Sequence, residues 1–189
     1  MTGHLPPARA IDLDAGAPLL VFGGPYSNLQ AVAALRRRAD ELGIAPANVI
    51  CTGDVVAYCA EPEETTHAIR DWGCHVVAGN CEEQLAAGAA DCGCGFEEGS
   101  ACDLLAKGWY PFAQQRLSRE NCAWMAGLPP AIAFTYAGAR VRVVHGGIRV
   151  TNRFVFASEA HVLSEEFAAA DADVVIAGHS GLPFVAKVA

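Results

Sequence analysis

Short apolar runs alternate with longer stretches of mixed polarity along the first half of the chain. Residues 19–22, 49–52 and 76–78 are short and apolar, which predicts three buried strands. Between them, residues 28–42 and 63–72 place apolar side chains at helical spacing, and each stretch ends at a glycine. Strands that are joined by such helices form parallel, right-handed crossovers. The pattern therefore predicts an α/β fold in which the loops after the strands share one rim of a sheet.

The second half of the chain is patterned less regularly. Residues 89–108 are rich in glycine, cysteine and acidic side chains, which predicts a Cys/Gly-rich insertion, and residues 1–17 predict an irregular lead-in. The other expected elements are a helix near 117–125, a hairpin of residues 132–136 and 140–145, a helix near 159–169 and a strand over 174–177. We expect one domain over residues 1–189, with the hairpin supplying a second sheet layer.

Length and charge exclude several classes of protein. With 189 residues and 52% hydrophobic content, the chain can bury one sizeable core. The formal net charge of −8 argues against a nucleic-acid partner and against binding to an anionic membrane. No apolar stretch approaches the ~20 residues of a transmembrane helix, and the first residues lack the pattern of a signal peptide. These features predict a cytoplasmic protein with no membrane partner.

The chain contains eight cysteines. Without an export signal, reduced thiols or metal ligands are favoured over disulfides. Cys92, Cys94 and Cys102, joined by Cys59 or Cys122, could gather around a second metal or an iron–sulfur cluster, although their spacing is not that of a C-x-x-C pair. Free thiols in a glycine-rich surface loop are the other reading of these residues.

A small residue and a polar residue stand together at four expected strand ends. The four pairs are Gly53-Asp54, Gly79-Asn80, His145-Gly146 and Gly178-His179. Because these strand ends share one rim, a carboxylate, an amide oxygen and two imidazoles form a plausible ligand set for a divalent ion. In the alternative reading, the four side chains only brace the ends of loops by hydrogen bonding.

Five stretches, in order, resemble the motifs of the calcineurin-like metallophosphoesterase family. They are residues 23–28 (GGPYSN), 53–58 (GDVVAY), 79–82 (GNCE), 145–147 (HGG) and 178–183 (GHSGLP). The resemblance implies a sandwich of sheet layers flanked by helices, and hydrolysis of a phosphomonoester, a phosphodiester or a nucleotide. It also implies one divalent transition metal, Mn, Fe or Zn, with four ligands, Asp54, Asn80, His145 and His179. Asp54 and His145 are the implied catalytic residues.

The chain departs from this family at the ligands of the other metal. Gly24, Tyr26 and Gly181 stand at the three positions that only this metal uses, so the chain resembles a degenerate member and a second metal is doubtful. Cys81 replaces the histidine that assists the leaving group, and a thiol is a poor acid for that step at neutral pH. Cys81 is a candidate catalytic nucleophile if its pKa is lowered, a candidate soft metal ligand, or a simple replacement.

We assign Asn28, Tyr26 and Arg149 to the substrate side of the site. Tyr26 could place its hydroxyl near the ion, and Arg149 could bind a phosphate as a cation, while packing and solvation are the alternatives for these two residues. The expected partner is a small phosphorylated substrate or a nucleotide.

Three functions remain open. The leading one is weak or altered metal-dependent hydrolysis, and the main alternative is a non-catalytic descendant that binds a metal, a nucleotide or a protein partner. The third is a thiol-based redox or iron–sulfur protein. Family members usually continue past the last motif, so we expect either a fragment or a fold that closes differently. An exposed sheet edge would then make an oligomer possible.

Overall fold

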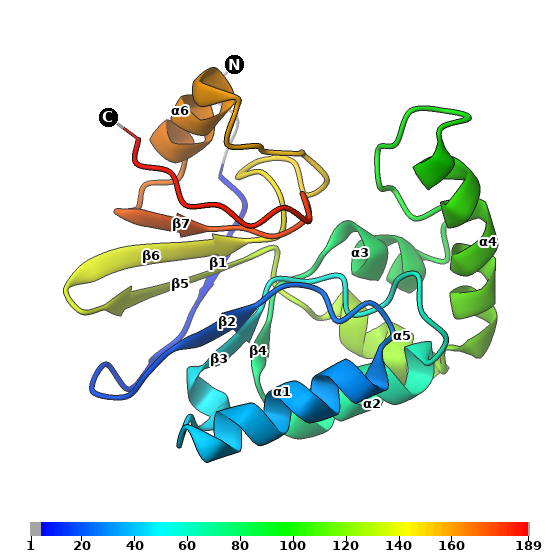
Figure 1. The fold of residues 1–189 in the computed structure, drawn as a ribbon, viewed down its shortest axis with the longest axis horizontal. Coiled ribbons are helices and arrows are strands. Elements are labelled where there is room, and N and C mark those ends of the chain that lie inside the picture. The colour runs from blue at the N-terminus through cyan, green and yellow to red at the C-terminus, as the bar shows by residue number, and fades with distance from the viewer. Residues whose placement is uncertain (1–4, 189) are drawn as a thin grey trace.

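The computed structural model describes residues 5–188, which form two packed sheets with helices on their outer sides (Figure 1). The first sheet is parallel and has the order β2-β3-β4. Its elements are β2 (Leu20–Phe22), α1 (Leu29–Glu41), the 3-10 helix η1 (Pro46–Asn48), β3 (Val49–Cys51), α2 (Pro62–Trp72) and β4 (His75–Val76). The predicted α/β class is confirmed, because α1 and α2 connect parallel strands and cover one face of this sheet.

The second sheet is mixed and has the order β1-β5-β6-β7. It contains the expected hairpin, and its strands are β1 (Ala8–Ala10), β5 (Ala131–Tyr136), β6 (Ala139–Val144) and β7 (Val174–Ile176). The expectation of an irregular lead-in is wrong at β1. Its sequence, Ala-Arg-Ala, has little preference for a strand by itself. These residues form a strand because they pair in parallel with β5, which lies far along the chain. Residues 1–4 of the lead-in lie outside the described part.

The two sheets share an apolar core that explains their alternating sequence. Ile50 of β3 packs in one cluster with Ile132 of β5 and Val143 of β6, whereas its neighbours Val49 and Cys51 belong to the cluster under the helices. Successive side chains of a strand point to opposite faces, so β3 contacts both layers. This packing brings the ends of strands from both sheets to a common edge.

The remaining helices lie beside the sheets. They are α3 (Asn80–Ala87), α4 (Ala101–Arg116) and α5 (Arg119–Ala126) at one end of the molecule, and α6 (Ala160–Ala169) near β7 (Figure 1). No helix within residues 5–188 is long and apolar enough to cross a membrane.

Helix α4 begins within the stretch 89–108, for which the sequence predicts a Cys/Gly-rich insertion. Its first half lies inside that stretch and continues through Gly108 and Pro111, two residues that disfavour a helix interior. The hydroxyl of Ser100 caps the helix by accepting from the backbone N–H of Asp103 at 3.2 Å. Burial of Tyr110 and its neighbours against the core outweighs the local preference.

Candidate metal centre

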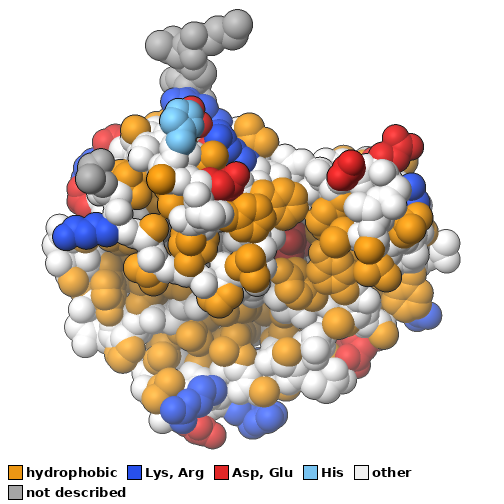
Figure 2. Space-filling model, turned by 45° about the horizontal axis from the view of Figure 1, so that its top comes forward, with side chains coloured by type: hydrophobic (Ala, Val, Ile, Leu, Met, Phe, Trp, Pro, Cys, Tyr) orange, Lys and Arg blue, Asp and Glu red, His pale blue; other side chains and the backbone are white. Residues whose placement is uncertain are grey.

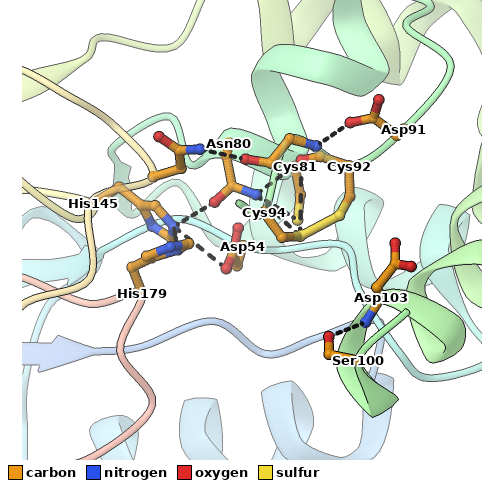
Figure 3. Close-up of a disulfide and its surroundings, with 12 residues drawn as sticks. Asp54, Asn80, Cys81, Asp91, Cys92, Cys94, Ser100, Asp103, His145 and His179 are labelled. Atoms are coloured by element: carbon orange, nitrogen blue, oxygen red, sulfur yellow. Dashed lines mark hydrogen bonds and ion pairs between the residues drawn. A yellow bond between two sulfur atoms is a disulfide. The ribbon is translucent and has the colours of Figure 1, made fainter. Parts of the chain in front are cut away.

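The four predicted metal ligands come together where the two sheets meet. Asp54 follows β3, Asn80 begins α3, His145 follows β6 and His179 follows β7. Nε2 of His145 lies 3.1 Å from Oδ1 of Asn80, 3.1 Å from Nδ1 of His179 and 3.4 Å from Oδ2 of Asp54 (Figure 3). The other three side chains therefore converge on one atom of His145.

Two glycines allow the ligand loops to pack this closely. A Cβ at Gly53 would lie 2.7 Å from the backbone nitrogen of Gly79 and 2.8 Å from Nδ1 of His145. Gly53 also has a φ of +96°, which glycine adopts at little cost. Asp54 and His179 have φ values of +54° and +57°, a region that only a few per cent of non-glycine residues occupy, with Asp and His among the more tolerant types.

The position of the hydrogen on the His145 ring determines whether the converging side chains can bind a cation. Nδ1 of His145 lies 2.7 Å from the carbonyl oxygen of Thr52, which can only accept, so Nδ1 carries the hydrogen. In neutral His145, Nε2 then presents a lone pair to the oxygens of Asn80 and Asp54, which are acceptors themselves. Facing lone pairs repel unless a cation lies between them. The arrangement thus calls for a proton on Nε2 or for a metal ion.

One orphaned atom of the group is available to a metal. Among the described residues, the buried Oδ1 of Asp54 has no hydrogen-bond partner; five other buried side-chain atoms share this property, including Nε2 of His179, which is the ring nitrogen opposite the Nδ1 that faces His145. Buried polar groups without partners are rare and need an explanation, such as an ion. Carboxylate and amide oxygens with two imidazoles suit a divalent transition metal. The residues present therefore fit the ion that the sequence predicts.

Charges within the site perturb three pKa values. Burial alone would raise the pKa of Asp54 and lower that of His145, yet their interaction lowers the pKa of Asp54 and raises that of His145. Burial and the neighbouring His145 lower the pKa of His179 to about 4. The lowered pKa of His179 keeps its ring neutral at pH 7, so that it retains a lone pair for an ion.

Glu82 is a functional residue to which the sequence reasoning assigned no role. It is fully buried, and its Oε2 accepts from the backbone N–H of Asp54 at 2.8 Å and of Gly79 at 2.9 Å. Burial and the charge of Asp54 raise the pKa of Glu82 to about 7. The available signal was a carboxylate three residues after Gly79, the spacing of a helix capping box. The carbonyl of Thr52 had no signal, because every residue has one.

Tyr26 occupies the space beside Gly24. A Cβ at Gly24 would lie 2.8 Å from Cε1 of Tyr26 and 2.5 Å from the carbonyl oxygen of Asp54. A larger residue at position 24 would therefore displace both neighbours. Burial and the charge of Asp54 raise the pKa of Tyr26, which keeps its phenol protonated.

The other two candidate substrate residues, Asn28 and Arg149, lie outside the converging group. Asn28 is the N-cap of α1, where its Oδ1 accepts from the backbone N–H of Ala31 at 2.9 Å. Arg149 is exposed on the segment that follows His145. The structure places neither side chain among the four converging ligands.

Cys81 is buried beside Asn80. Burial and the charge of Asp54 raise the pKa of this thiol, whereas a nucleophilic role requires a lowered pKa. Its surroundings favour a neutral thiol over a thiolate.

The expectation of reduced thiols is wrong for one pair. Cys92 and Cys94 form a disulfide, because Gly93, with a φ of +61°, turns the chain and brings their Cα atoms to 5.3 Å. Cys59 and Cys102 are exposed free thiols. Among the described residues, no group of three metal-ligating side chains includes these thiols, so the structure does not form the cluster that Cys92, Cys94 and Cys102 could have made.

The metal centre opens into a large cavity of about 1010 Å³. Its wall includes Tyr26, His145 and His179, together with hydrophobic side chains of α6, β7 and the C-terminal segment 181–188. The ring of Phe154 packs against that of His179, with centroids 4.3 Å apart. Figure 2 shows hydrophobic side chains over much of this end of the molecule. The cavity has the size of pockets that hold small-molecule ligands.

Comparisons with known proteins agree with this geometry. A family model for the calcineurin-like phosphoesterase superfamily domain matches residues 27–188. An uncharacterized protein from Methanocaldococcus jannaschii is 27% identical over 168 residues, which cover 88% of this chain and 63% of that protein. The chain thus spans less than two thirds of the length of this curated relative.

Two crystal structures are similar to the chain. One is a metallophosphoesterase from Sphaerobacter thermophilus, with a TM-score of 0.64 and 20% identity over 86% of this chain and 60% of that one. The other is a hypothetical protein from Pyrococcus horikoshii OT3, with a TM-score of 0.70 and 16% identity over 87% of this chain and 70% of that one. At these identities the likeness shows a shared fold.

Proposed function

Because the chain belongs to the calcineurin-like phosphoesterase superfamily, we propose that it is a phosphoesterase that works with a single divalent metal ion. The proposed ligands are Asp54, Asn80, His145 and His179. The observation that carries this proposal is that side-chain atoms of Asn80, His179 and Asp54 converge on Nε2 of His145. The carbonyl of Thr52 holds the ring hydrogen of His145 on the opposite nitrogen, Nδ1. The unpartnered Oδ1 of Asp54 adds a further ligand atom.

The ion supplies chemistry, and the chain supplies position. When bound, a divalent ion such as Mn²⁺, Fe²⁺ or Zn²⁺ polarises a phosphoryl oxygen and lowers the pKa of water at the site toward ~7. The carbonyl of Thr52 keeps His145 in the tautomer that offers Nε2. The carboxylate of Glu82 holds the backbone of Asp54, and the cavity beside His179 gives space for the organic part of a substrate.

The substrate class follows from the residue that replaces the family's histidine. The neutral, buried thiol of Cys81 is a poor general acid, so the site favours esters whose leaving group departs without protonation. Aryl phosphodiesters and nucleotide phosphoanhydrides have such leaving groups. We propose a small phosphorylated substrate, nucleotides included, with Tyr26 at the wall of its cavity and Asn28 and Arg149 farther out on the substrate side.

Hydrolase assays on purified protein test the proposal. Turnover of bis(p-nitrophenyl) phosphate and of nucleotides is measured with Mn²⁺, Fe²⁺, Zn²⁺ and Mg²⁺. Asp54→Ala should abolish metal-dependent turnover, whereas Asp40→Ala, an exposed carboxylate on α1, should leave it unchanged. Equal turnover of both variants would refute the proposed site.

The second candidate is a binding module without catalysis. It is motivated by Gly24, Tyr26 and Gly181 at the positions of the other metal's ligands, and by the neutral Cys81. Metal binding that depends on Asp54, without turnover of any phosphoester, would support this function over the first.

A further inference from the structure

The amide of Asn80 has two ends with different partners. Oδ1 faces Nε2 of His145 at 3.1 Å, while Nδ2 donates to the carbonyl oxygen of Cys92 at 2.9 Å and lies 3.3 Å from Sγ of Cys94 (Figure 3). A backbone carbonyl only accepts, so the NH₂ end must face Cys92. The cysteine loop thus determines that the oxygen of Asn80 faces the metal centre.

The loop that holds Asn80 is anchored at both sides. The backbone N–H of Gly93 donates to Oδ1 of Asp91 at 2.8 Å, and its carbonyl oxygen accepts from Nδ2 of Asn152 at 2.8 Å. The disulfide closes a ring of only three residues, which fixes the carbonyl of Cys92 relative to the sulfur of Cys94. The two nearer partners of the Asn80 NH₂ group therefore belong to one covalent ring, while the third, Sγ of Cys81 at 3.6 Å, lies outside it.

The disulfide is buried but lies close to the surface. Cys92 and Cys94 are themselves buried, while the flanking Asp91 and Gly95 are exposed.

We propose that Cys92 and Cys94 form a reversible redox site that sets the metal affinity of the centre by orienting Asn80. This inference rests on the metal site proposed above. In the oxidation step the two thiols give two protons and two electrons to a low-molecular-weight disulfide, which becomes two thiols as the Cys92–Cys94 bond forms. A dithiol reverses the step and is itself oxidised to a disulfide.

The two redox states present different atoms to the ion. In the oxidised state the ring holds the NH₂ end of Asn80, and Oδ1 points to the centre. In the reduced state the ring is open and only the hydrogen bonds of Gly93 hold the loop, so the carbonyl of Cys92 is held less firmly and the amide can turn. An NH₂ group has no lone pair for a metal. Cys92 and Cys94 are positioning residues that act through Asn80.

Equilibrium binding of Mn²⁺ tests the inference without any measurement of turnover. Mn²⁺ is chosen because it prefers oxygen ligands and gains little from the released thiols. The oxidised protein and a dithiol-reduced sample, freed of reductant under anaerobic conditions, are titrated in competition with a fluorescent chelator. Thiol titration in denaturant should give six and eight free thiols respectively, as the six free cysteines and the single pair require.

Reduction should weaken Mn²⁺ binding by about 10- to 100-fold, the usual effect of losing a partner that orients a metal ligand. Equal affinity of the two states would overturn the redox inference and leave the metal site standing. No Mn²⁺ binding in either state would overturn both. Tighter Zn²⁺ binding on reduction, with Mn²⁺ unchanged, would show that the thiols act as ligands and would also overturn it.

Variants separate orientation of Asn80 from general loosening of the loop. The double variant Cys92→Ser, Cys94→Ser should bind Mn²⁺ as weakly as the reduced wild type, and dithiol should not change its affinity. The double variant Cys59→Ser, Cys102→Ser should show the same change of Mn²⁺ affinity on reduction as the wild type. Asn80→Asp presents an oxygen in either orientation, so reduction should leave its Mn²⁺ affinity nearly unchanged. A full redox effect in Asn80→Asp would refute the role of the amide.

Discussion

Removing the carboxylate of Glu82 should destabilise the fold and loosen the metal centre together. In Glu82→Ala, the backbone N–H groups of Asp54 and Gly79 lose acceptors at 2.8 and 2.9 Å inside the core, and that of Val56 loses a longer one at 3.4 Å. Each unsatisfied buried donor costs about 1–3 kcal/mol, so loss of the two short bonds alone costs about 2–6 kcal/mol. Burial and the charge of Asp54 raise the pKa of Glu82 to about 7, so the charged carboxylate is unfavourable in this position. Glu82→Ala removes that unfavourable charge, so we expect a net loss of stability in the lower half of this range.

The neighbouring Glu83 provides a matched control. It lies on the same helix but is exposed, and its carboxylate accepts from the hydroxyl of Thr151 at 2.9 Å. Urea unfolding with chelator at pH 7 should show a loss of less than about 1 kcal/mol for Glu83→Ala. Glu82→Gln keeps one acceptor oxygen and should fall between the two. Mn²⁺ affinity should drop about 10- to 100-fold in Glu82→Ala only. Equal losses in the two alanine variants would refute the reasoning.

Three further predictions concern the ion, the pH and the substrate. Because Gly24 and Gly181 offer no side-chain ligand and Tyr26 stays protonated, dialysed protein should hold one equivalent of Mn²⁺ at this cleft by elemental analysis, and two equivalents would contradict this. Because the pKa of His145 is raised in the fold, protonation of His145 stabilises the metal-free fold. This stabilisation is complete below the ordinary pKa near 6.5 and disappears as the pH rises through the raised pKa. Since the proton and Mn²⁺ compete for His145, the gain in Tm from Mn²⁺ should grow from pH 6 to 8. A gain that shrinks over this range would speak against proton displacement from His145. With the neutral thiol of Cys81 as its neighbour, the site should hydrolyse p-nitrophenyl esters much faster than alkyl esters, and similar rates for both would indicate an unrecognised acid.

Much of the centre could be predicted from sequence because its ligands follow strands. A buried strand is recognisable from a local pattern, and the carboxyl ends of parallel strands lie at one edge of a sheet. The sequence alone therefore predicts that Asp54, Asn80, His145 and His179 lie together. The family resemblance had the same basis, since each of its motifs is a short run at a strand end. The prediction of a single domain over residues 1–189 stays a prediction.

Other features depended on partners that no local pattern encodes. Strand β1 exists through pairing with β5, and α4 passes through Pro111 because packing of Tyr110 and its neighbours outweighs helix propensity. The disulfide of Cys92 and Cys94 depends on how Gly93 turns the chain.

The sequence by itself determined which ligand atoms were available, because residue identity sets the donor chemistry. Only the tertiary structure decided how those atoms are aimed. The carbonyl of Thr52 selects the tautomer of His145, and the carbonyl of Cys92 selects the end of Asn80 that faces it. Both selections are made by backbone oxygens, which every residue carries, so their effect depends on position in space and leaves no trace in the order of side chains.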